Sequence, residues 1–185
     1  MAMERRGKRV IYSQGYFDGA CFFYSLANAA RCVTGKAVAE KAWHRAIRES
    51  PFRIEDFLSG DGTTRLDGSA IALNLAGQMF LDELGVELHL GLLEGAISPS
   101  VVAESAGKDQ VIITAIDDGS HWVPIVDSMK AEACIACSLA LHDWSVQYDE
   151  QISQNKRVFN VARSFHELKI WSGPSFIVSR ANTVS

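Results

Sequence analysis

The pattern of apolar and polar positions in the first half of the chain predicts helices. Apolar residues recur at helical spacing over 21–34, and Gly35 supplies a stop at the end of that segment. The stripe consists of Phe22, Leu26, Ala29, Ala30 and Val33. Further helices are expected over 37–49, over 69–84 before Gly85, and over 101–106 after Pro99. Residues 59–65 are expected to form a loop.

The second half carries strand signals. Residues 110–116 and 121–126 are apolar runs separated by Asp117-Asp118-Gly119-Ser120, which predicts a tight hairpin. Further strands are expected over 10–12, 86–92, 133–141, 159–161, 168–171 and 176–178. Helices followed by strands favour an α+β fold over alternating βαβ units. We therefore expect an N-terminal helical lobe packed on a twisted antiparallel β-sheet or half-barrel.

The length of 185 residues fits a single domain, 1–185, with a mainly helical lobe over 1–108 and a mainly β lobe over 109–185. Hydrophobic residues make up 48% of the chain, so it can bury a sizeable core. The net charge is -4, with acids and bases scattered along the chain, and this gives no sign of a nucleic-acid partner. The basic residues near the N-terminus are interpreted as a solvated arm.

No apolar run is long enough to span a bilayer, and residues 1–9 lack the apolar stretch of a secretory signal. We expect a cytoplasmic protein, or one exported without a visible signal peptide. The four cysteines, Cys21, Cys32, Cys134 and Cys137, are expected to be free thiols. The Cys134-x-x-Cys137 spacing lies in an apolar, strand-like run, which favours two core cysteines over a zinc or redox pair. No metal and no cofactor is expected.

Cys21 has the setting of a nucleophile. It follows the Asp18-Gly19 turn and begins the first predicted helix, where the helix dipole favours a thiolate. Cys32 lies about three turns further along the same helix, where the dipole disfavours the anion. A thiolate that attacks a carbonyl needs hydrogen-bond donors for the developing oxyanion. The backbone N–H of Cys21 and the side-chain amide of Gln14 are the candidates.

Among the five histidines, His121 is the candidate base, because it begins a buried strand directly after a hairpin turn. Asp127, six residues further along the same strand, is too distant to orient the imidazole. If residues 128–134 reverse the chain, the next strand brings residues near 141–143 opposite His121. Asp143 is therefore the candidate orienting residue. His142, which points to the opposite face, is the rival base if the register shifts by one.

The run from Gln14 to Phe22, Gln-Gly-Tyr-Phe-Asp-Gly-Ala-Cys-Phe, resembles the oxyanion glutamine and nucleophile segment of papain-like cysteine peptidases. Gly119-Ser120-His121-Trp122-Val123 resembles their histidine strand, and Leu141-His142-Asp143-Trp144 resembles the strand end that supplies the third residue. Compact bacterial peptidases that cut double-glycine leader peptides are the most similar in size. The spacing from Gln14 to Cys21 is one residue longer than in papain, and the segment from His121 to Asp143 is longer than in the leader peptidases.

The resemblance implies a papain-like fold and a cysteine peptidase or amide hydrolase that acts on a peptide or protein through an acyl-enzyme. The implied catalytic residues are Cys21, His121, Asp143 and Gln14. A deamidase or transglutaminase of the toxin or effector type would use the same triad. In a different class, the chain would be a non-catalytic binding module on the same scaffold, with Cys21 as a structural residue.

Overall fold

The computed structural model describes residues 10–14, 19–66, 69–139 and 149–181. The helical elements are α1 (Cys21–Thr34), α2 (Glu40–Arg48), α3 (Ile54–Leu58), the 3-10 helix η1 (Gly62–Leu66), α4 (Ala70–Glu83) and α5 (Pro99–Gly107). The strands are β1 (Leu88–Leu92), β2 (Val111–Ile116), β3 (His121–Met129), β4 (Glu132–Ile135), β5 (Gln151–Ile152), β6 (Val158–Phe159), β7 (Val161–Ser164) and β8 (Phe176–Arg180).

The chain is α+β, as the sequence predicts, and α1 has the bounds expected from its apolar stripe. Four local expectations are wrong. Residues 10–12 and 168–171 form no strand, the loop expected over 59–65 contains most of η1, and the strand expected over 133–141 ends at Ile135. In these places the backbone hydrogen bonds go elsewhere: for example, Glu150 accepts the N–H groups of Val10 and Ile11.

The main sheet has six strands in the order β1-β8-β2-β3-β4-β7, and every neighbouring pair is antiparallel. The chain therefore inserts β8, its last strand, between β1 and β2. β5 and β6 form a separate two-stranded ribbon. The hairpin β2–β3 lies near the centre of the sheet, and the turn that precedes His121 is bonded to the loop after β7, where Asp117 and Asp118 donate their N–H groups to the carbonyls of Leu168 and Lys169.

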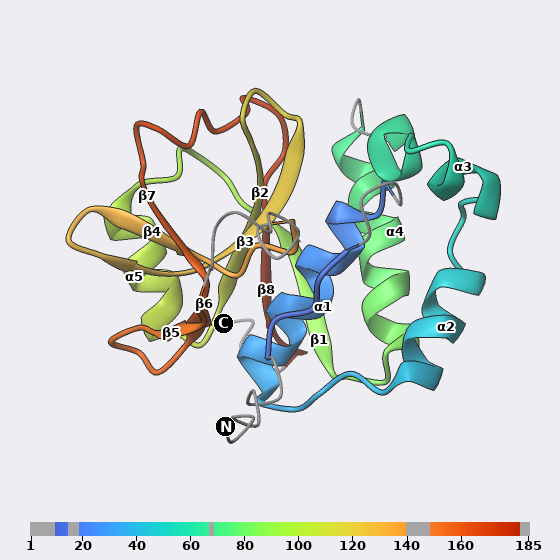
Figure 1. Ribbon diagram of the computed structural model, residues 1–185, viewed down its shortest axis with the longest axis horizontal. Coiled ribbons are helices and arrows are strands. Elements are labelled where there is room, and N and C mark those ends of the chain that lie inside the picture. Colours follow the sequence, from blue (N-terminus) through green and yellow to red (C-terminus); the bar gives the residue numbers. More distant parts are fainter. Residues whose placement is uncertain (1–9, 15–18, 67–68, 140–148, 182–185) are drawn as a thin grey trace, which may run out of the picture.

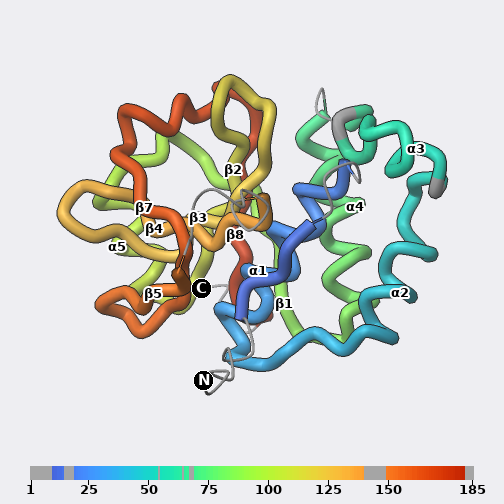
Figure 2. Tube along the Cα trace, in the orientation of Figure 1, coloured from blue at the N-terminus to red at the C-terminus, as the bar shows by residue number. Residues whose placement is uncertain are grey.

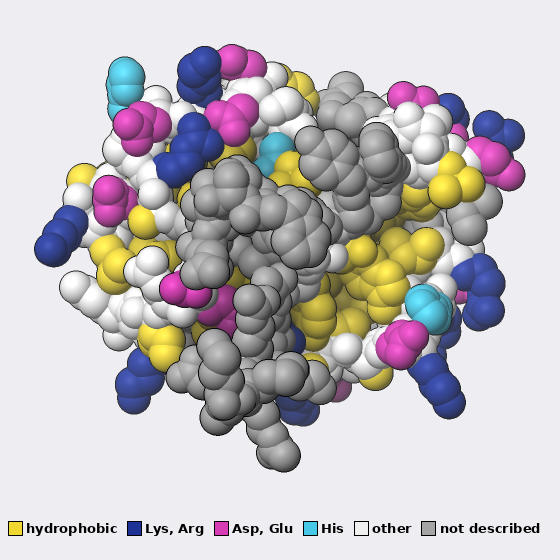
Figure 3. Space-filling view, viewed as in Figure 1, with side chains coloured by type: hydrophobic (Ala, Val, Ile, Leu, Met, Phe, Trp, Pro, Cys, Tyr) yellow, Lys and Arg dark blue, Asp and Glu magenta, His cyan; other side chains and the backbone are white. Residues whose placement is uncertain are grey.

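Helices cover both faces of this sheet. Figures 1 and 2 show α1 between the sheet and α4, with α2 and α3 further out and α5 on the other side of the strands. The alternation of side chains along β3 matches this arrangement. Trp122 and Val126 belong to the core cluster shared with α1, whereas Val123 and Ile125 pack with Val102 of α5. On the face shown in Figure 3, hydrophobic side chains gather over the helical part of the molecule.

The contact between α1 and the sheet consists of aromatic rings and one bridging hydroxyl. Phe22 packs edge-on against Trp122, with 5.0 Å between ring centroids, and against Phe176 at 5.8 Å. The hydroxyl oxygen of the buried Ser25 lies 2.8 Å from the carbonyl oxygens of both Cys21 and Trp122, so its single proton is shared between these two acceptors. The first turn of α1 therefore lies directly on the first residues of β3.

We expect Ser25→Ala to lower the free energy of unfolding by about 1–3 kcal/mol, because the buried carbonyl of Trp122 loses a donor. Thr34→Ala is the matched control. Thr34 bonds back to the carbonyl of Ala30 within the same helix and makes no link to the sheet, so its loss should cost about 0.5 kcal/mol or less. Urea denaturation of both variants measures the difference. Equal costs would contradict the bridging role of Ser25.

Candidate functional site

Cys21 is the first residue of α1, as expected, and is 8% exposed. The N-cap residue is Ala20, whose side chain makes no capping hydrogen bond, and the first turn contains no acidic residue. The positive end of the helix dipole is therefore not offset by a charge on its own first turn. A thiolate on Cys21 would gain from that field.

Two interlocked glycine turns fix the approach to Cys21. Gly19 has φ +53°, and a Cβ placed on it would lie 2.7 Å from the carbonyl oxygen of Gly60. Gly62 has φ +46°, and a Cβ placed there would collide with the carbonyl of Gly19. The N–H of Thr63 also donates to that carbonyl at 3.3 Å. Only glycine fits at both positions, and the turn ahead of the nucleophile is held by the segment before α4.

His121 opens β3 opposite Ile116 and is 7% exposed. The preceding turn places Asp117 and Asp118 in the left-handed region, at φ 51° and 60°. Arg163 of β7 forms a bidentate ion pair with Asp117, with both N–O distances 3.1 Å. This pair ties the turn to the neighbouring edge of the sheet and so helps to hold His121 in place.

The two ring nitrogens of His121 have different surroundings. Nε2 lies 3.4 Å from the Sγ atom of Cys137. Nδ1 is buried and has no hydrogen-bond partner among the described residues. Burial lowers the pKa of His121 to about 4, and the nearby carboxylate of Asp117 opposes this shift only weakly. At neutral pH the imidazole is therefore uncharged and can accept a proton.

The structure brings the backbone of Cys21, at the start of α1, close to that of Trp122, the residue after His121 at the start of β3. The residues that follow them, Phe22 and Trp122, are in ring contact, and the carbonyls of Cys21 and Trp122 share the Ser25 hydroxyl. These two carbonyl oxygens are thus separated by no more than two hydrogen-bond lengths. In the sequence, the only indication that these two segments meet is the expectation that Cys21 acts as nucleophile and His121 as base.

Gln14 also lies in this region and is 6% exposed. Its Oε1 accepts a hydrogen bond of 2.9 Å from the hydroxyl of Ser138, the residue after Cys137. Because the oxygen is engaged by Ser138, the amide nitrogen is the end of the side chain that can donate to an oxyanion. Gln14, Cys137 and His121 are therefore linked through short contacts.

Asp143, the expected orienting residue, and His142, the rival candidate for the base, lie outside the described residues. Asp127 is described, and it has a structural role. Burial would raise its pKa, but hydrogen bonds from Ser153, Ser128 and Asn155 outweigh that effect and lower the pKa. Asp127 thus ties β3 to the β5–β6 ribbon and does not serve His121.

Cys137 is the residue at the site that the sequence did not single out. Cys134 fits the expectation of a buried strand cysteine in β4, but Cys137 comes two residues after the strand and touches the histidine ring. The signal lay in the register. Ile125 pairs with Ile135, so a residue two positions further along lies diagonally beside His121. Because a continuous strand was expected to reach residue 141, Cys137 was interpreted as a core residue of that strand and not as a neighbour of His121.

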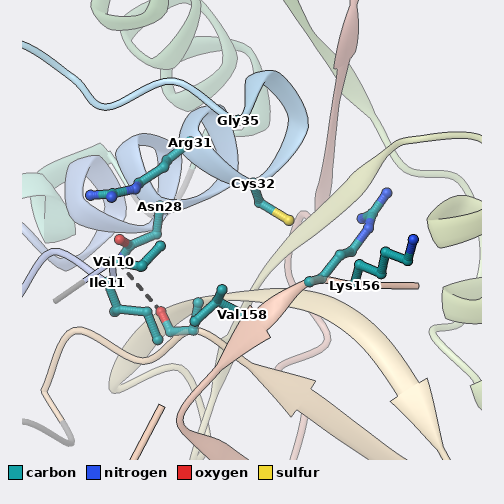
Figure 4. A pocket seen from close by; sticks show the side chains of 10 residues that line it. Val10, Ile11, Asn28, Arg31, Cys32, Gly35, Lys156 and Val158 are labelled. Atoms are coloured by element: carbon teal, nitrogen blue, oxygen red, sulfur yellow. Dashed lines mark hydrogen bonds between the residues drawn. The ribbon is translucent and has the colours of Figure 1, made fainter. Parts of the chain in front are cut away.

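A pocket of about 270 Å³ lies at the other end of α1 and not at Cys21. Figure 4 shows the Cys32 sulfur from α1 and the Lys156 side chain from the turn between β5 and β6 in its lining. Arg157, beside Lys156 in the same turn, also lines the pocket. Arg157 is buried and donates to the carbonyls of Ala106, Gln110 and Val126. Its guanidinium is therefore occupied in holding the fold together.

Within the described ranges, no three His, Cys, Asp or Glu side chains gather so as to hold a metal ion. No helix among the described residues is long and apolar enough to cross a membrane. A scan of the sequence against models of protein families gives no match, and a search among curated proteins gives none either. The function of the chain is therefore inferred from the geometry of its own residues.

Burial raises the pKa of the Cys32 and Cys134 thiols to about 11. We expect both to stay unlabelled by iodoacetamide in the folded protein at pH 8, because the thiol form is unreactive. Peptide mapping after alkylation, with a urea-unfolded sample as the positive control, measures this. Labelling of either cysteine at the rate of the unfolded sample would contradict the burial described here.

The lowered pKa of His121 predicts a pH-dependent stability. Between the unfolded value of about 6.5 and the folded value of about 4, the unfolded chain binds the extra proton. The contribution of His121 to the free energy of unfolding is therefore fully present above about pH 6.5, and about 3 kcal/mol of it is lost as the pH drops to about 4. His121→Gln should remove this part of the pH dependence, whereas replacing the exposed His44 by Gln should not. Denaturation at pH 7, 5.5 and 4 gives the comparison, and parallel curves for all three proteins would refute it.

Proposed function

We propose that this chain is a papain-like cysteine hydrolase that cleaves amide bonds in a peptide or protein through an acyl-enzyme. Cys21 is the nucleophile, His121 the general base and Gln14 an oxyanion donor. The observation that carries the proposal is the contact of the first turn of α1, which Cys21 begins, with Trp122, the residue that follows the buried histidine at the start of β3.

Three further features support these roles. The first turn of α1 carries no side-chain cap at Ala20 and no acidic residue, which favours a Cys21 thiolate. The Nδ1 atom of His121 has no described partner, so it can take a proton. The amide of Gln14 is oriented by Ser138. An antiparallel sheet carrying the histidine, with the cysteine helix packed on it, agrees with a papain-like fold.

The proposed reaction has two steps. His121 accepts the proton of the Cys21 thiol, and the thiolate adds to the substrate carbonyl. The N–H of Cys21 and the amide of Gln14 stabilise the oxyanion, and the imidazolium then protonates the leaving amine as the C–N bond breaks. Water, deprotonated by His121, attacks the thioester and releases the acid. Because the imidazole starts uncharged, the proton moves with the attack rather than before it. Deamidation or transamidation of a glutamine side chain would follow the same course.

A second candidate function is a non-catalytic binding module on this scaffold. The observation that favours it is the contact of His121 with a thiol, because among the described residues no carboxylate bonds the ring to stabilise an imidazolium. In that case Cys21 is a buried structural thiol. The two functions differ in the reactivity of Cys21.

We expect Cys21 to be alkylated by iodoacetamide at pH 7 at least about tenfold faster than an ordinary thiol, because the helix field favours negative charge on the sulfur and His121 takes the thiol proton as the sulfur attacks. His121→Ala should lower this rate by about tenfold or more, and Cys134→Ser should leave it unchanged. The measurement is the second-order rate of labelling against pH, followed peptide by peptide. A Cys21 that labels no faster than in the unfolded chain would reject the hydrolase and favour the binding module.

Substrate class is tested on the intact protein with a mixed peptide library and mass spectrometry. Hydrolysis of the main chain gives fragments, deamidation adds about one dalton, and transamidation joins two peptides. Cys21→Ser serves as the inactive control. Turnover that survives in that variant would show that the nucleophile is assigned wrongly.

A further inference from the structure

We propose that Cys137 is the positioning residue of the site: its sulfur accepts the Nε2–H of His121 and holds the imidazole so that Nδ1 is free to act on Cys21. A thiol would then fill the role that the sequence led us to assign to Asp143. The catalytic meaning of this inference rests on the proposed function, but the contact itself does not.

The first argument is the geometry of the pair. Sγ of Cys137 and Nε2 of His121 are 3.4 Å apart, within the range of an N–H hydrogen bond to sulfur, and both side chains are buried. A buried N–H without an acceptor costs about 1–3 kcal/mol. Bulk water is excluded from a pair this deeply buried, so the sulfur is the acceptor that the described residues offer to this nitrogen.

The second argument is that Cys137 is itself held rigidly. Its N–H donates to Oδ1 of Asn160 at 2.8 Å, and Nδ2 of Asn160 donates back to its carbonyl at 2.9 Å. The backbone N–H of Asn160 donates to the carbonyl of Ile135 at 3.0 Å. Asn160 therefore replaces a strand partner just where β4 ends. A group that orients a catalytic imidazole needs this kind of support, because its own position decides that of the ring.

The same bonds argue against Cys137 as the nucleophile. Its N–H is already given to Asn160, so it is not available to an attacked carbonyl, and the residue does not begin a helix. Cys21 is the first residue of α1, where the helix dipole favours an anion. The two thiols near His121 are thus suited to different tasks.

The third argument concerns the tautomer. A histidine can accept the thiol proton of Cys21 at Nδ1 only if its own proton is on Nε2. An acceptor at Nε2 enforces this form, whereas a donor there would put the proton on Nδ1 and block the base. A thiol can donate or accept, so the selection comes from Nδ1: it is buried with no partner among the described residues, and a proton there would be left unpaired, whereas a proton on Nε2 has the Cys137 sulfur as its acceptor.

A thiol orients the ring without supplying a charge. The charged groups near His121 are Asp117, in the turn before it, and Arg163, which neutralises Asp117 through the bidentate pair and lies close enough to Cys137 to be affected by it. Burial therefore dominates, and the pKa of His121 falls to about 4. A carboxylate at position 137 would raise that pKa toward or above its ordinary value of about 6.5.

The test follows the ring nitrogens of His121 by 15N NMR of the full-length protein across pH, in the wild type and in Cys137→Ala, Cys137→Ser and Cys137→Asp. The wild type should show the Nε2–H form and no titration above about pH 5. Cys137→Ser should keep the tautomer, Cys137→Ala should give a mixture of the two, and Cys137→Asp should titrate near or above pH 6. Cys134→Ser, which changes a buried cysteine three residues away, should match the wild type.

Two NMR outcomes would overturn the inference: an Nδ1–H tautomer in the wild type, or an unchanged His121 spectrum in Cys137→Ala. A change of tautomer in Asp143→Asn, together with none in Cys137→Ala, would return the role to Asp143. Cys137→Ser differs from the wild type by one atom, so it keeps the test valid if the alanine variant does not fold.

Alkylation of Cys21 in the same variants separates this inference from the proposed function. If both hold, Cys137→Asp labels about tenfold faster than the wild type at pH 6, because a charged imidazolium stabilises the thiolate, and Cys137→Ala labels about tenfold more slowly at pH 7. If the NMR results hold but Cys21 is inert in every variant, Cys137 orients His121 in a protein that is not a hydrolase.

Discussion

The Ser25 hydroxyl joins the first turn of α1 to the first residues of β3, and the rest of the site depends on that junction. A helix that packs on a sheet through aromatic rings alone can slide along its axis at little cost. The Ser25 hydroxyl, which is shared between the carbonyls of Cys21 and Trp122, fixes the position of the helix relative to the strand. The start of α1 and the start of β3 therefore stay together. Cys21 and Trp122, which follows His121, come from segments about 100 residues apart in the sequence, and this short contact is what brings their backbones together.

The site is also built to be uncharged at rest. His121 and its neighbours are buried, and a charged pair in such a place carries a large desolvation cost unless each charge is well bonded. Here the imidazole is neutral, its described partner is a thiol, and the nearest carboxylate is paired with Arg163. The arrangement favours a stable closed core. For the proposed hydrolase, reactivity then has to arise during the reaction, when the helix field and the proposed oxyanion donors act on charge that is only forming.

Much of this could be predicted from the sequence where the determinants are local. The apolar stripe and Gly35 gave the bounds of α1, and the Asp-Asp-Gly-Ser turn between apolar runs placed His121 at the start of a strand. The predictions that were wrong concern elements whose ends are set by residues distant in the sequence. The end of β4 at Ile135 is set by Asn160, which takes over the backbone bonds of Cys137, and no pattern near residue 137 indicates this. The insertion of β8 between β1 and β2 is likewise decided by packing across the whole chain. Asp143, chosen because an antiparallel return strand would bring it opposite His121, lies outside the described residues and stays a prediction. Cys137 is buried as expected, but its contact with the imidazole was not foreseen.

The interlocked turns at Gly19 and Gly62 have a consequence for how this protein can change over time. Each backbone occupies the space that a side chain on the other would need, so neither position can be altered first and compensated later by the other. The segment between α3 and α4 is therefore tied to the nucleophile even though it contributes no chemistry to it. An exchange of loops around this region would have to keep the contact between the Gly19 and Gly62 backbones. A homologue that loses this contact should also lose the backbone geometry that precedes Cys21.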